Sequence, residues 1–554
     1  MSVFDYKRRS SSRVDIGQIP MGAEFPIRVQ SMTNTSTMDT VGSAEQAARI
    51  IDAGAAYVRL TAQGVREATN LGNIEEALHT MGYNTPLVAD IHFNPKAAEV
   101  AATVVEKVRI NPGNFVDPAR TFKKLEYTDE EYAAEIIRIE ESLIPFIELC
   151  RKHNTAIRIG VNHGSLSDRI MSRYGDTPAG MVESAMEFLR VFVKQNFKDV
   201  VISIKASNTV VMVNTVRLLV DAMNREDMHF PLHLGVTEAG NGEDGRVKSA
   251  VGIGALLHQG IGDTIRVSLS EEPEAEIPVA QSLLAHISHL ATAPASAIDA
   301  TYCSGFNPID PQRLQSTAIE LVGGTNPPIA IGVDTLNEDL IAYIDADTTE
   351  ADLLTAASQN AGKILVIYSH SANPVAAIQS ATHALKSRDV FNPIIPQLSY
   401  EDDLDDVTIK ASADFGAMLL NGMHDGIDLR APRLNTEQHR SLSLAILQAA
   451  RLRFTHTEYI SCPGCGRTLF DLQTTVNEIK RATSHLPHLK IGIMGCIVNG
   501  PGEMADADYG YVGAAAGKVS LYRQKECVER NIPSEQALPR LIEMLKSEGK
   551  WVDP

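Results

Sequence analysis

Apolar residues gather in eight short runs between Ile27 and Ser268, and polar stretches with helical spacing separate them. Most runs are almost continuously apolar, which is typical of parallel strands buried on both faces. Eight strands alternating with helices over about 240 residues is the number found in a (β/α)8 barrel. The sequence therefore predicts an α/β protein whose N-terminal domain is such a barrel. The runs begin at residues 27, 56, 86, 107, 156, 200, 231 and 264.

A doubly wound open sheet is the alternative arrangement of alternating strands and helices. That fold binds nucleotides through a Gly-rich loop after its first strand. The segment QSMTNT at 30–35 contains no glycine. The barrel is therefore the favoured prediction.

The residues that end the predicted strands point to a ligand. Seven of the eight strands carry an ionisable residue at the C-terminal end, where barrel active sites lie. Four Arg and one Lys at one mouth would repel one another strongly in a low-dielectric cup, unless an anion neutralised them. Bidentate recognition by Arg makes phosphate the natural anion. These residues are Arg59, Asp90 with His92, Arg109 with Asn111, Arg158 with Asn162, Lys205, Glu238, and Arg266 with Ser268.

After about residue 286 the pattern no longer continues the barrel. Residues 287–446 contain strand-like runs at 327–333, 364–369 and 407–412, acidic loops, and no catalytic constellation. We expect a central α/β insert domain that acts as a spacer or interface. Domain boundaries are predicted at 1–286, 287–446 and 447–554. In the last domain, an amphipathic helix, a strand, a Gly-rich hairpin and a terminal helix predict a small α+β domain.

Composition narrows the protein's class. A formal net charge of −19 over 554 residues argues against a general nucleic-acid binder. Cys150, Cys303 and Cys527 are scattered, so no disulfide framework is expected and a reducing cytoplasmic location is favoured. The sequence contains no apolar stretch of membrane-spanning length and no apolar targeting segment near residue 1.

The C-terminal domain contains a candidate metal centre. Cys462 and Cys465 form a Cys-x2-Cys pair, Cys496 follows 31 residues later, and Glu503 comes soon after, all in Gly/Pro-rich segments. Three thiolates fit a [4Fe–4S] cluster in which one iron lacks a cysteine. A zinc staple stays open, because Cys527, His485, His488 or Glu503 could supply a fourth ligand. A thioredoxin-like redox pair lacks the strand pattern expected before Cys462.

Long motifs in the same order resemble the (E)-4-hydroxy-3-methylbut-2-enyl diphosphate synthases of the non-mevalonate isoprenoid route. The resemblance covers the barrel and the last 100 or so residues, and the insert is similar to that of the three-domain, plant-like form. The motifs are VQSMTNT (29–35), LVADIHF (87–93), VRINPGN (108–114), IRIGVNHGSL (157–166), LHLGVTEAG (232–240), CPGC (462–465) and GCIVNGPGE (495–503).

The resemblance implies an iron–sulfur oxidoreductase that reductively opens 2-C-methyl-D-erythritol 2,4-cyclodiphosphate and expels water, with electrons from reduced ferredoxin or flavodoxin. Cys462, Cys465 and Cys496 would hold a [4Fe–4S] cluster, with Glu503 on the fourth iron. Glu238 would handle protons, and Asp90 and His92 would support the reaction, although either could be structural. Residues expected to bind the diphosphate are Arg59, Arg109, Arg158, Asn162, Lys205, Arg266 and Ser268.

Barrel and cluster lie on different domains, so we expect a closing motion that brings them together. The site could be completed within one chain or across a homodimer. The alternative from another class is a phosphosugar-binding barrel with a zinc-stapled or otherwise non-catalytic C-terminal module.

Overall fold

The computed structural model describes residues 2–91, 94–117, 126–465, 467–486, 488–497, 500–504 and 506–553. The chain forms two compact units. The barrel unit comprises residues 10–242, 262–280 and 456–554, and the insert unit comprises residues 1–9, 243–261 and 281–455. The domain boundaries at 286 and 446 stay predictions.

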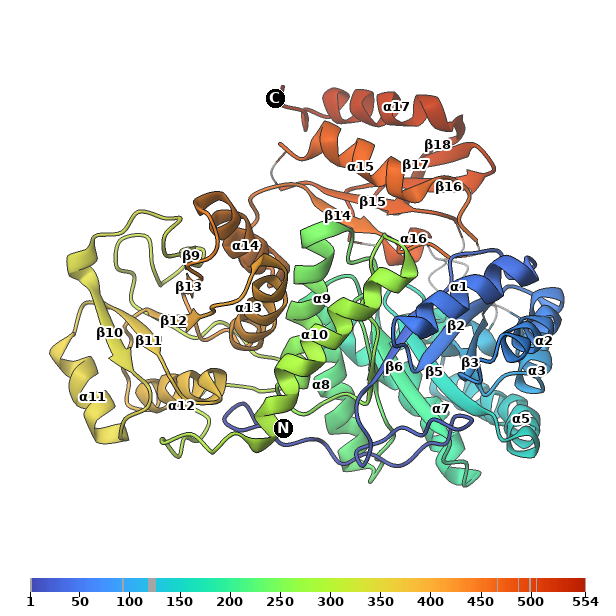
Figure 1. Ribbon diagram of the computed structural model, residues 1–554, viewed down its shortest axis with the longest axis horizontal. Coiled ribbons are helices and arrows are strands. Elements are labelled where there is room, and N and C mark those ends of the chain that lie inside the picture. Colours follow the sequence, from blue (N-terminus) through green and yellow to red (C-terminus); the bar gives the residue numbers. More distant parts are fainter. Residues whose placement is uncertain are drawn as a thin grey trace. The chain divides into compact units, whose positions relative to one another are not determined.

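The barrel unit contains the expected barrel of parallel strands (Figure 1). The strand order is β6-β5-β4-β3-β2-β1-β8-β7, and a parallel bridge between Ile202 and Leu232 links β6 to β7. The (β/α)8 prediction is therefore confirmed. The strands are β1 Arg28–Met32, β2 Tyr57–Ala62, β3 Leu87–Ile91, β4 Lys107–Ile110, β5 Ala156–Asn162, β6 Val200–Lys205, β7 His233–Leu234 and β8 Thr264–Ile265.

Helices follow the strands, and several begin at side chains that cap them. Asp39 accepts from the Gly42 N–H, and Thr128 forms a capping box with Glu131. The helices are α1 Thr40–Asp52, α2 Val65–Thr80, α3 Pro95–Ala102, α4 Pro112–Phe115, α5 Asp129–His153, α6 Asp168–Tyr174, α7 Pro178–Lys194, α8 Thr209–Arg225, α9 Gly242–Leu257 and α10 Glu276–Ser288, with 3-10 turns at Pro273–Ala275 and His289–Thr292.

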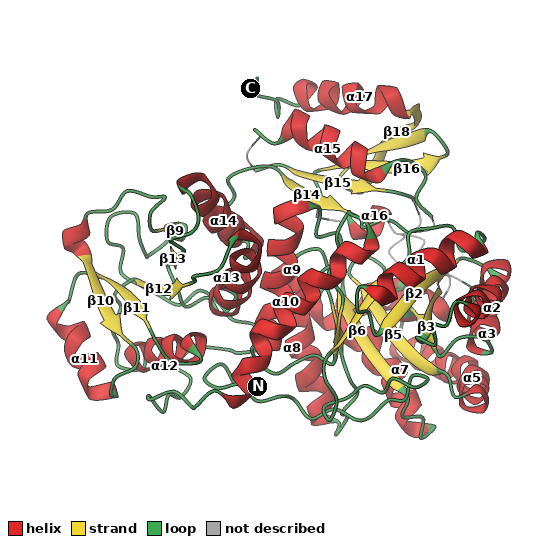
Figure 2. Ribbon diagram, viewed as in Figure 1, coloured by secondary structure: helices red, strands yellow, loops and turns green. Residues whose placement is uncertain are grey.

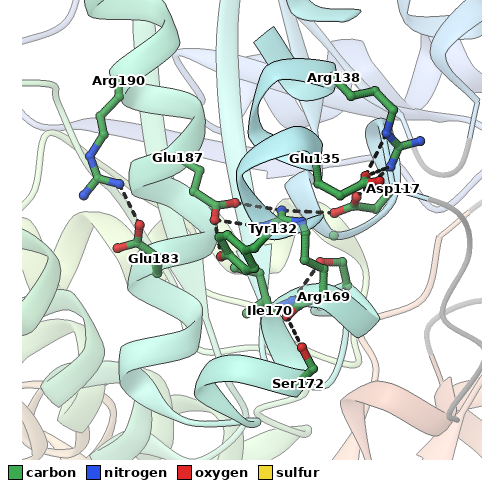
Figure 3. Close-up of polar contacts among 12 residues, drawn as sticks. Asp117, Tyr132, Glu135, Arg138, Arg169, Ile170, Ser172, Glu183, Glu187 and Arg190 are labelled. Carbon is green, nitrogen blue, oxygen red and sulfur yellow. Dashed lines mark hydrogen bonds and ion pairs between the residues drawn. The ribbon is translucent and has the colours of Figure 1, made fainter. Parts of the chain in front are cut away.

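A buried ion-pair network fastens the helices that follow β4 and β5 (Figure 3). Arg169 on α6 donates to both oxygens of Glu187 on α7, at 2.8 and 2.7 Å, and to Asp117 at 3.2 Å. The Tyr132 hydroxyl donates to the same Glu187 carboxylate. These buried, charge-assisted hydrogen bonds connect α5, α6 and α7. Helix α6 follows the loop that begins after Asn162.

The insert unit contains a five-stranded parallel sheet with the order β10-β11-β12-β13-β9 (Figure 2). The run at 407–412 was predicted as a strand, and this prediction is wrong because those residues lie inside a helix that Asp403 caps. A short apolar run cannot distinguish a buried helix from a strand. The elements are β9 Ile329–Ala330, β10 Ile341–Asp345, α11 Glu350–Gln359, β11 Ile364–Tyr368, α12 Pro374–Lys386, β12 Ile394–Ser399, α13 Leu404–Leu419, β13 Gly426–Arg430 and α14 Thr436–Ala449, with a 3-10 turn at Glu338–Leu340.

The C-terminal part of the barrel unit has the expected α+β character. Its sheet order is β14-β15-β16-β17-β18, parallel through β16 and antiparallel after it. Figure 2 shows α15 and α17 on one face of this sheet and α16 on the other. The elements are β14 Glu458–Ser461, α15 Leu472–Thr483, β15 Lys490–Met494, α16 Gly500–Glu503, β16 Tyr509–Ala515, β17 Lys518–Arg523, β18 Glu526–Pro533 and α17 Ser534–Ser547.

Candidate active site

One pocket of the barrel unit brings the predicted strand-end residues and the cysteine loops together. His92 lies outside the described residues, as does the side chain of Glu503, whose backbone is in α16. The individual roles stay predictions. The predicted residues that line this pocket are Arg59, Asp90, Arg109, Arg158, Asn162, Lys205, Glu238, Arg266, Ser268, Cys462, Cys465 and Cys496.

Asp90 is the carboxylate on which three guanidinium groups converge. Arg109 Nη1 lies 3.2 Å from Asp90 Oδ1, and Arg59 Nη2 lies 3.7 Å from Oδ2. Arg467 Nη2, from the loop after the Cys-x2-Cys pair, lies 3.8 Å from Oδ2. Arg467 was not among the predicted residues. Its position two residues after Cys465 was the available signal, since a cation beside thiolates stabilises their charge.

The orientation of Arg109 depends on strand β5. Its Nη2 donates to the Gly160 carbonyl at 2.8 Å and to Asn162 Oδ1 at 3.2 Å. A Cβ on residue 160 would lie 2.2 Å from Arg109 Nε, so only glycine leaves room for this guanidinium. The strand therefore holds Arg109 with one face toward Asp90 and another toward Asn162.

Arg266 differs from the other cations because a carboxylate already neutralises it. Its Nε and Nη2 donate to the two oxygens of Glu276, at 2.9 and 2.8 Å. The Ser31 hydroxyl donates to the same carboxylate at 2.6 Å. Glu276 was also missed by the sequence analysis, because nothing in its helix pattern distinguishes it from an exposed glutamate. This ion pair holds Arg266 at the barrel mouth and adds no net charge to the pocket.

The remaining cations leave the pocket with excess positive charge. Burial lowers the pKa of Lys205 well below its usual value, and Arg59, Arg158 and Arg266 lower it further. Burial and the neighbouring guanidinium groups likewise lower the pKa of Arg158, whose Nε and Nη1 have no hydrogen-bond partner among the described residues. Burial is the main cause that lowers the pKa of Arg59 to about 10, although Asp90 opposes it. A bound polyanion would offset the repulsion among these cations and stabilise their charged forms.

The cysteine loops provide a donor set that suits a soft metal centre. Cys462, Cys465 and Cys496 are free thiols, each partly buried. The Gly495 N–H donates to Cys462 Sγ at 3.2 Å, and the Arg467 guanidinium and the Cys465 thiolate attract each other electrostatically. Donors of this kind stabilise thiolate ligands and tune a cluster that they hold. These residues therefore fit the cluster that the sequence predicts.

Within the barrel unit, direct contacts join the barrel to the cysteine loops. The Ser270 and Ser461 hydroxyls lie 2.6 Å apart, and Ser270 Oγ also donates to the Cys462 carbonyl at 2.9 Å. A parallel bridge pairs Ala239 with Ser461. The residue next to Glu238 thus contacts the strand that leads into Cys462, so barrel and cysteine loops form one pocket in a single chain.

Comparisons with known proteins agree with this architecture. Residues 11–281 match the family model described as the GcpE TIM-barrel domain, and residues 458–547 match the GcpE protein C-terminal domain. Fold and site thus define a GcpE-type protein, with a barrel followed by a cysteine-bearing domain.

Curated relatives define the family more closely. The chain is 52% identical to 4-hydroxy-3-methylbut-2-en-1-yl diphosphate synthase (flavodoxin) of Phocaeicola vulgatus, with 100% of both chains covered. It is 52% identical to the protein of that name from Bacteroides fragilis, covering 100% of this chain and 97% of the relative. A chloroplastic, ferredoxin-type synthase of Oryza sativa subsp. japonica is 40% identical, covering 100% and 89%. The chain belongs to the family of 4-hydroxy-3-methylbut-2-en-1-yl diphosphate synthases.

Among the described residues, no helix is both long enough and apolar enough to span a membrane.

Proposed function

We propose that this chain converts 2-C-methyl-D-erythritol 2,4-cyclodiphosphate to (E)-4-hydroxy-3-methylbut-2-enyl diphosphate in the pocket described above. The conversion consumes two electrons and two protons, breaks the ring C–O bond to phosphate, and releases one water. The observation that carries the proposal is the composition of one pocket, where a cationic barrel mouth and three cysteines meet. The cationic mouth is needed to bind a diphosphate, and the cysteines are needed to hold the group that delivers electrons.

The cations bind and orient the diphosphate. Within the described part of the chain, the guanidinium groups of Arg59, Arg109 and Arg467 all lie within 4 Å of the Asp90 carboxylate, so three cations meet at one carboxylate. Lys205 and Arg158 add two buried cations, with Asn162 and Ser268 as neutral partners on the pocket wall. Bidentate donors of this kind fix a phosphate in position as well as in charge.

Glu238 is our candidate for proton handling. It is only 3% exposed, lines the pocket, and has a left-handed backbone with φ of 51°. A non-glycine residue held in this conformation is uncommon and is often found at functional sites. Proton delivery to the departing hydroxyl, which leaves as water, requires such a buried acid close to the substrate. Asp90 positions the guanidinium groups around it.

Cys462, Cys465 and Cys496 would hold a [4Fe–4S] cluster, with Glu503 as a replaceable fourth ligand. When bound, the cluster supplies electrons singly and a Lewis-acidic iron. The electron donor would be reduced flavodoxin or ferredoxin, because the relatives are named as flavodoxin-type or ferredoxin-type synthases. A cytoplasmic location accords with free thiols.

The alternative, a phosphosugar-binding barrel with a zinc-stapled module, is not supported by the relatives, which are all named as synthases. The geometry also disfavours zinc. Within the described part of the chain, the sulfur atoms of Cys462, Cys465 and Cys496 do not all lie within 4.8 Å of one another. A single tetrahedral ion needs its ligands that close, whereas a cluster presents separate irons.

The test is anaerobic turnover of the cyclodiphosphate with reduced ferredoxin or flavodoxin, comparing wild type with Glu503→Ala. We expect product from the wild type and a large loss in the variant, with the cluster's visible absorption retained. A colourless wild-type protein that contains stoichiometric zinc and gives no product would refute the proposal.

A further inference from the structure

Two histidines and an aspartate meet within the insert unit. His258 Nε2 lies 2.8 Å and His286 Nε2 lies 2.7 Å from the same oxygen of Asp414, Oδ1. These histidines are 156 and 128 residues from Asp414 in the sequence. Their ligand atoms all lie within 4.8 Å of one another. Two imidazoles and one carboxylate converging in this way form a common protein ligand set for divalent transition metals.

The close packing of α9 and α13 brings His258 and Asp414 together, and α10 provides His286 (Figure 1). A Cβ on Gly254 would lie 2.6 Å from Ala413 Cβ, and one on Gly416 would lie 2.8 Å from Val251 Cα. Glycines therefore allow the two helices to approach at the level of Asp414. His258 follows the end of α9, so the same contact fixes its ring against the carboxylate.

A further residue orients the carboxylate. The Tyr400 hydroxyl donates to Asp414 Oδ2 at 2.8 Å, which directs the other oxygen toward the two imidazoles. Asp414 is 3% exposed and Tyr400 is 8% exposed, so the arrangement is built into the interior. Outer hydrogen bonds that fix a ligating carboxylate are a regular feature of metal sites.

His258, His286 and Asp414 lie on one wall of a cavity of about 440 Å³. The cavity lies at the carboxyl ends of β11 and β12, where ligands of parallel α/β sheets usually bind. Its lining includes Tyr368, Ser369 and His370 after β11, and Ser399 and Tyr400 at the end of β12. An ion held by three protein ligands on this wall would have its remaining coordination positions directed into the cavity.

We propose that His258, His286 and Asp414 form a binding site for a first-row divalent metal ion such as Zn²⁺, with open coordination positions facing this cavity. The histidines bind through Nε2 and the aspartate through Oδ1. All three ligands belong to the insert unit, so the proposal does not rest on the iron–sulfur cluster or on the proposed reaction.

The test uses full-length protein with its cluster loaded under anaerobic conditions, dialysed against Zn²⁺ and analysed for zinc per chain. We expect wild type to retain one zinc that His286→Gln loses, with affinity reduced at least about tenfold. His370→Gln is the matched control, because it makes the same change on the same cavity outside the ligand set. We expect it to bind zinc as wild type does.

The same comparison distinguishes zinc bound at the proposed site from zinc bound by the cysteines, because His286→Gln changes only the proposed site. Zinc retained equally by wild type and His286→Gln, or absent from both, overturns the proposal. If His286→Gln does not fold, Tyr400→Phe replaces it, since this change removes only the hydroxyl that orients Asp414. We then expect Zn²⁺ affinity to fall about tenfold, and unchanged affinity in folded Tyr400→Phe overturns the proposal as well.

Discussion

Arg467 Nη2, two residues beyond Cys465, lies 3.8 Å from Oδ2 of Asp90 at the end of barrel strand β3. One cation thereby lies close to both the substrate pocket and the cysteines, because Arg467 also interacts favourably with the charge of the Cys465 thiolate. Its side chain is only 6% exposed. A guanidinium in this position would influence both the cluster and the substrate pocket.

Replacing Arg467 should therefore change the cluster's reduction potential. Loss of a buried positive charge beside a ligating sulfur disfavours the reduced state. We expect Arg467→Gln to shift the potential negative by on the order of tens of millivolts and to lower kcat/KM about tenfold or more. An EPR-monitored redox titration measures the shift. Arg481→Gln, which changes an exposed arginine of α15, should leave the potential unchanged. An unchanged potential in Arg467→Gln would exclude this role.

Binding of a diphosphate should take up protons at Lys205. Burial and three arginines lower the pKa of this lysine well below its usual value in the free pocket, and an anion beside it raises the pKa again. Between those two pKa values the free lysine is neutral and the bound one is charged. Binding therefore takes up protons and weakens as the pH rises through this window.

Titration calorimetry with inorganic pyrophosphate in two buffers of different ionisation enthalpy measures that uptake. We expect net uptake in wild type and much less in Lys205→Met. Lys198→Met, which changes an exposed lysine, is the control and should match wild type. Equal uptake by all three proteins would contradict the assignment to Lys205.

A single chain should complete its own active site. The described pocket contains both Glu238 and Cys496 from one chain. We therefore expect a mixture of Glu238→Gln chains and Cys496→Ser chains to remain as inactive as either variant alone, measured by anaerobic turnover after co-refolding or co-expression. Recovered activity would show that sites are shared between chains.

The ion pairs of α7 should differ sharply in their contribution to stability (Figure 3). Removing the charge of Glu187 leaves the buried Arg169 without its bidentate partner, which costs about 3 kcal/mol of unfolding free energy. Glu183 instead pairs with the half-exposed Arg190, so its loss should cost about 0–1 kcal/mol. Denaturant unfolding of Glu187→Gln and Glu183→Gln makes the comparison, and equal losses would contradict it.

The sequence predicted the barrel well because its strands are near-continuous apolar runs that end in charged residues. It also predicted that Arg59, Arg109 and Lys205 lie at one mouth, since parallel strands share an edge, and these residues line one pocket. Glu276 and Arg467 could not be found in this way, because their importance comes from partners remote in the chain. The prediction of a strand at 407–412 was wrong because an apolar run of this length carries no period that separates helix from strand.

The contact between Gly164 and Gly502 offers a test of the closed pocket. A Cβ on Gly164 would lie 2.2 Å from the Gly502 carbonyl oxygen, so the loop after β5 and helix α16 approach each other through bare backbone. Gly164→Ala should push α16 away and displace the neighbouring Glu503 from its proposed place on the cluster.

Gly175→Ala separates this effect from backbone strain. Both glycines have positive φ, 80° and 71°, so either alanine should cost on the order of 1–3 kcal/mol of stability. Among the described residues, a Cβ on Gly175 would meet only a methyl group of Thr177, at 3.4 Å. We expect turnover to fall at least about tenfold in Gly164→Ala and to stay near wild type in Gly175→Ala, at matched thermal stability. Equal turnover in the two variants would mean that catalysis does not need the close approach of α16 to the barrel.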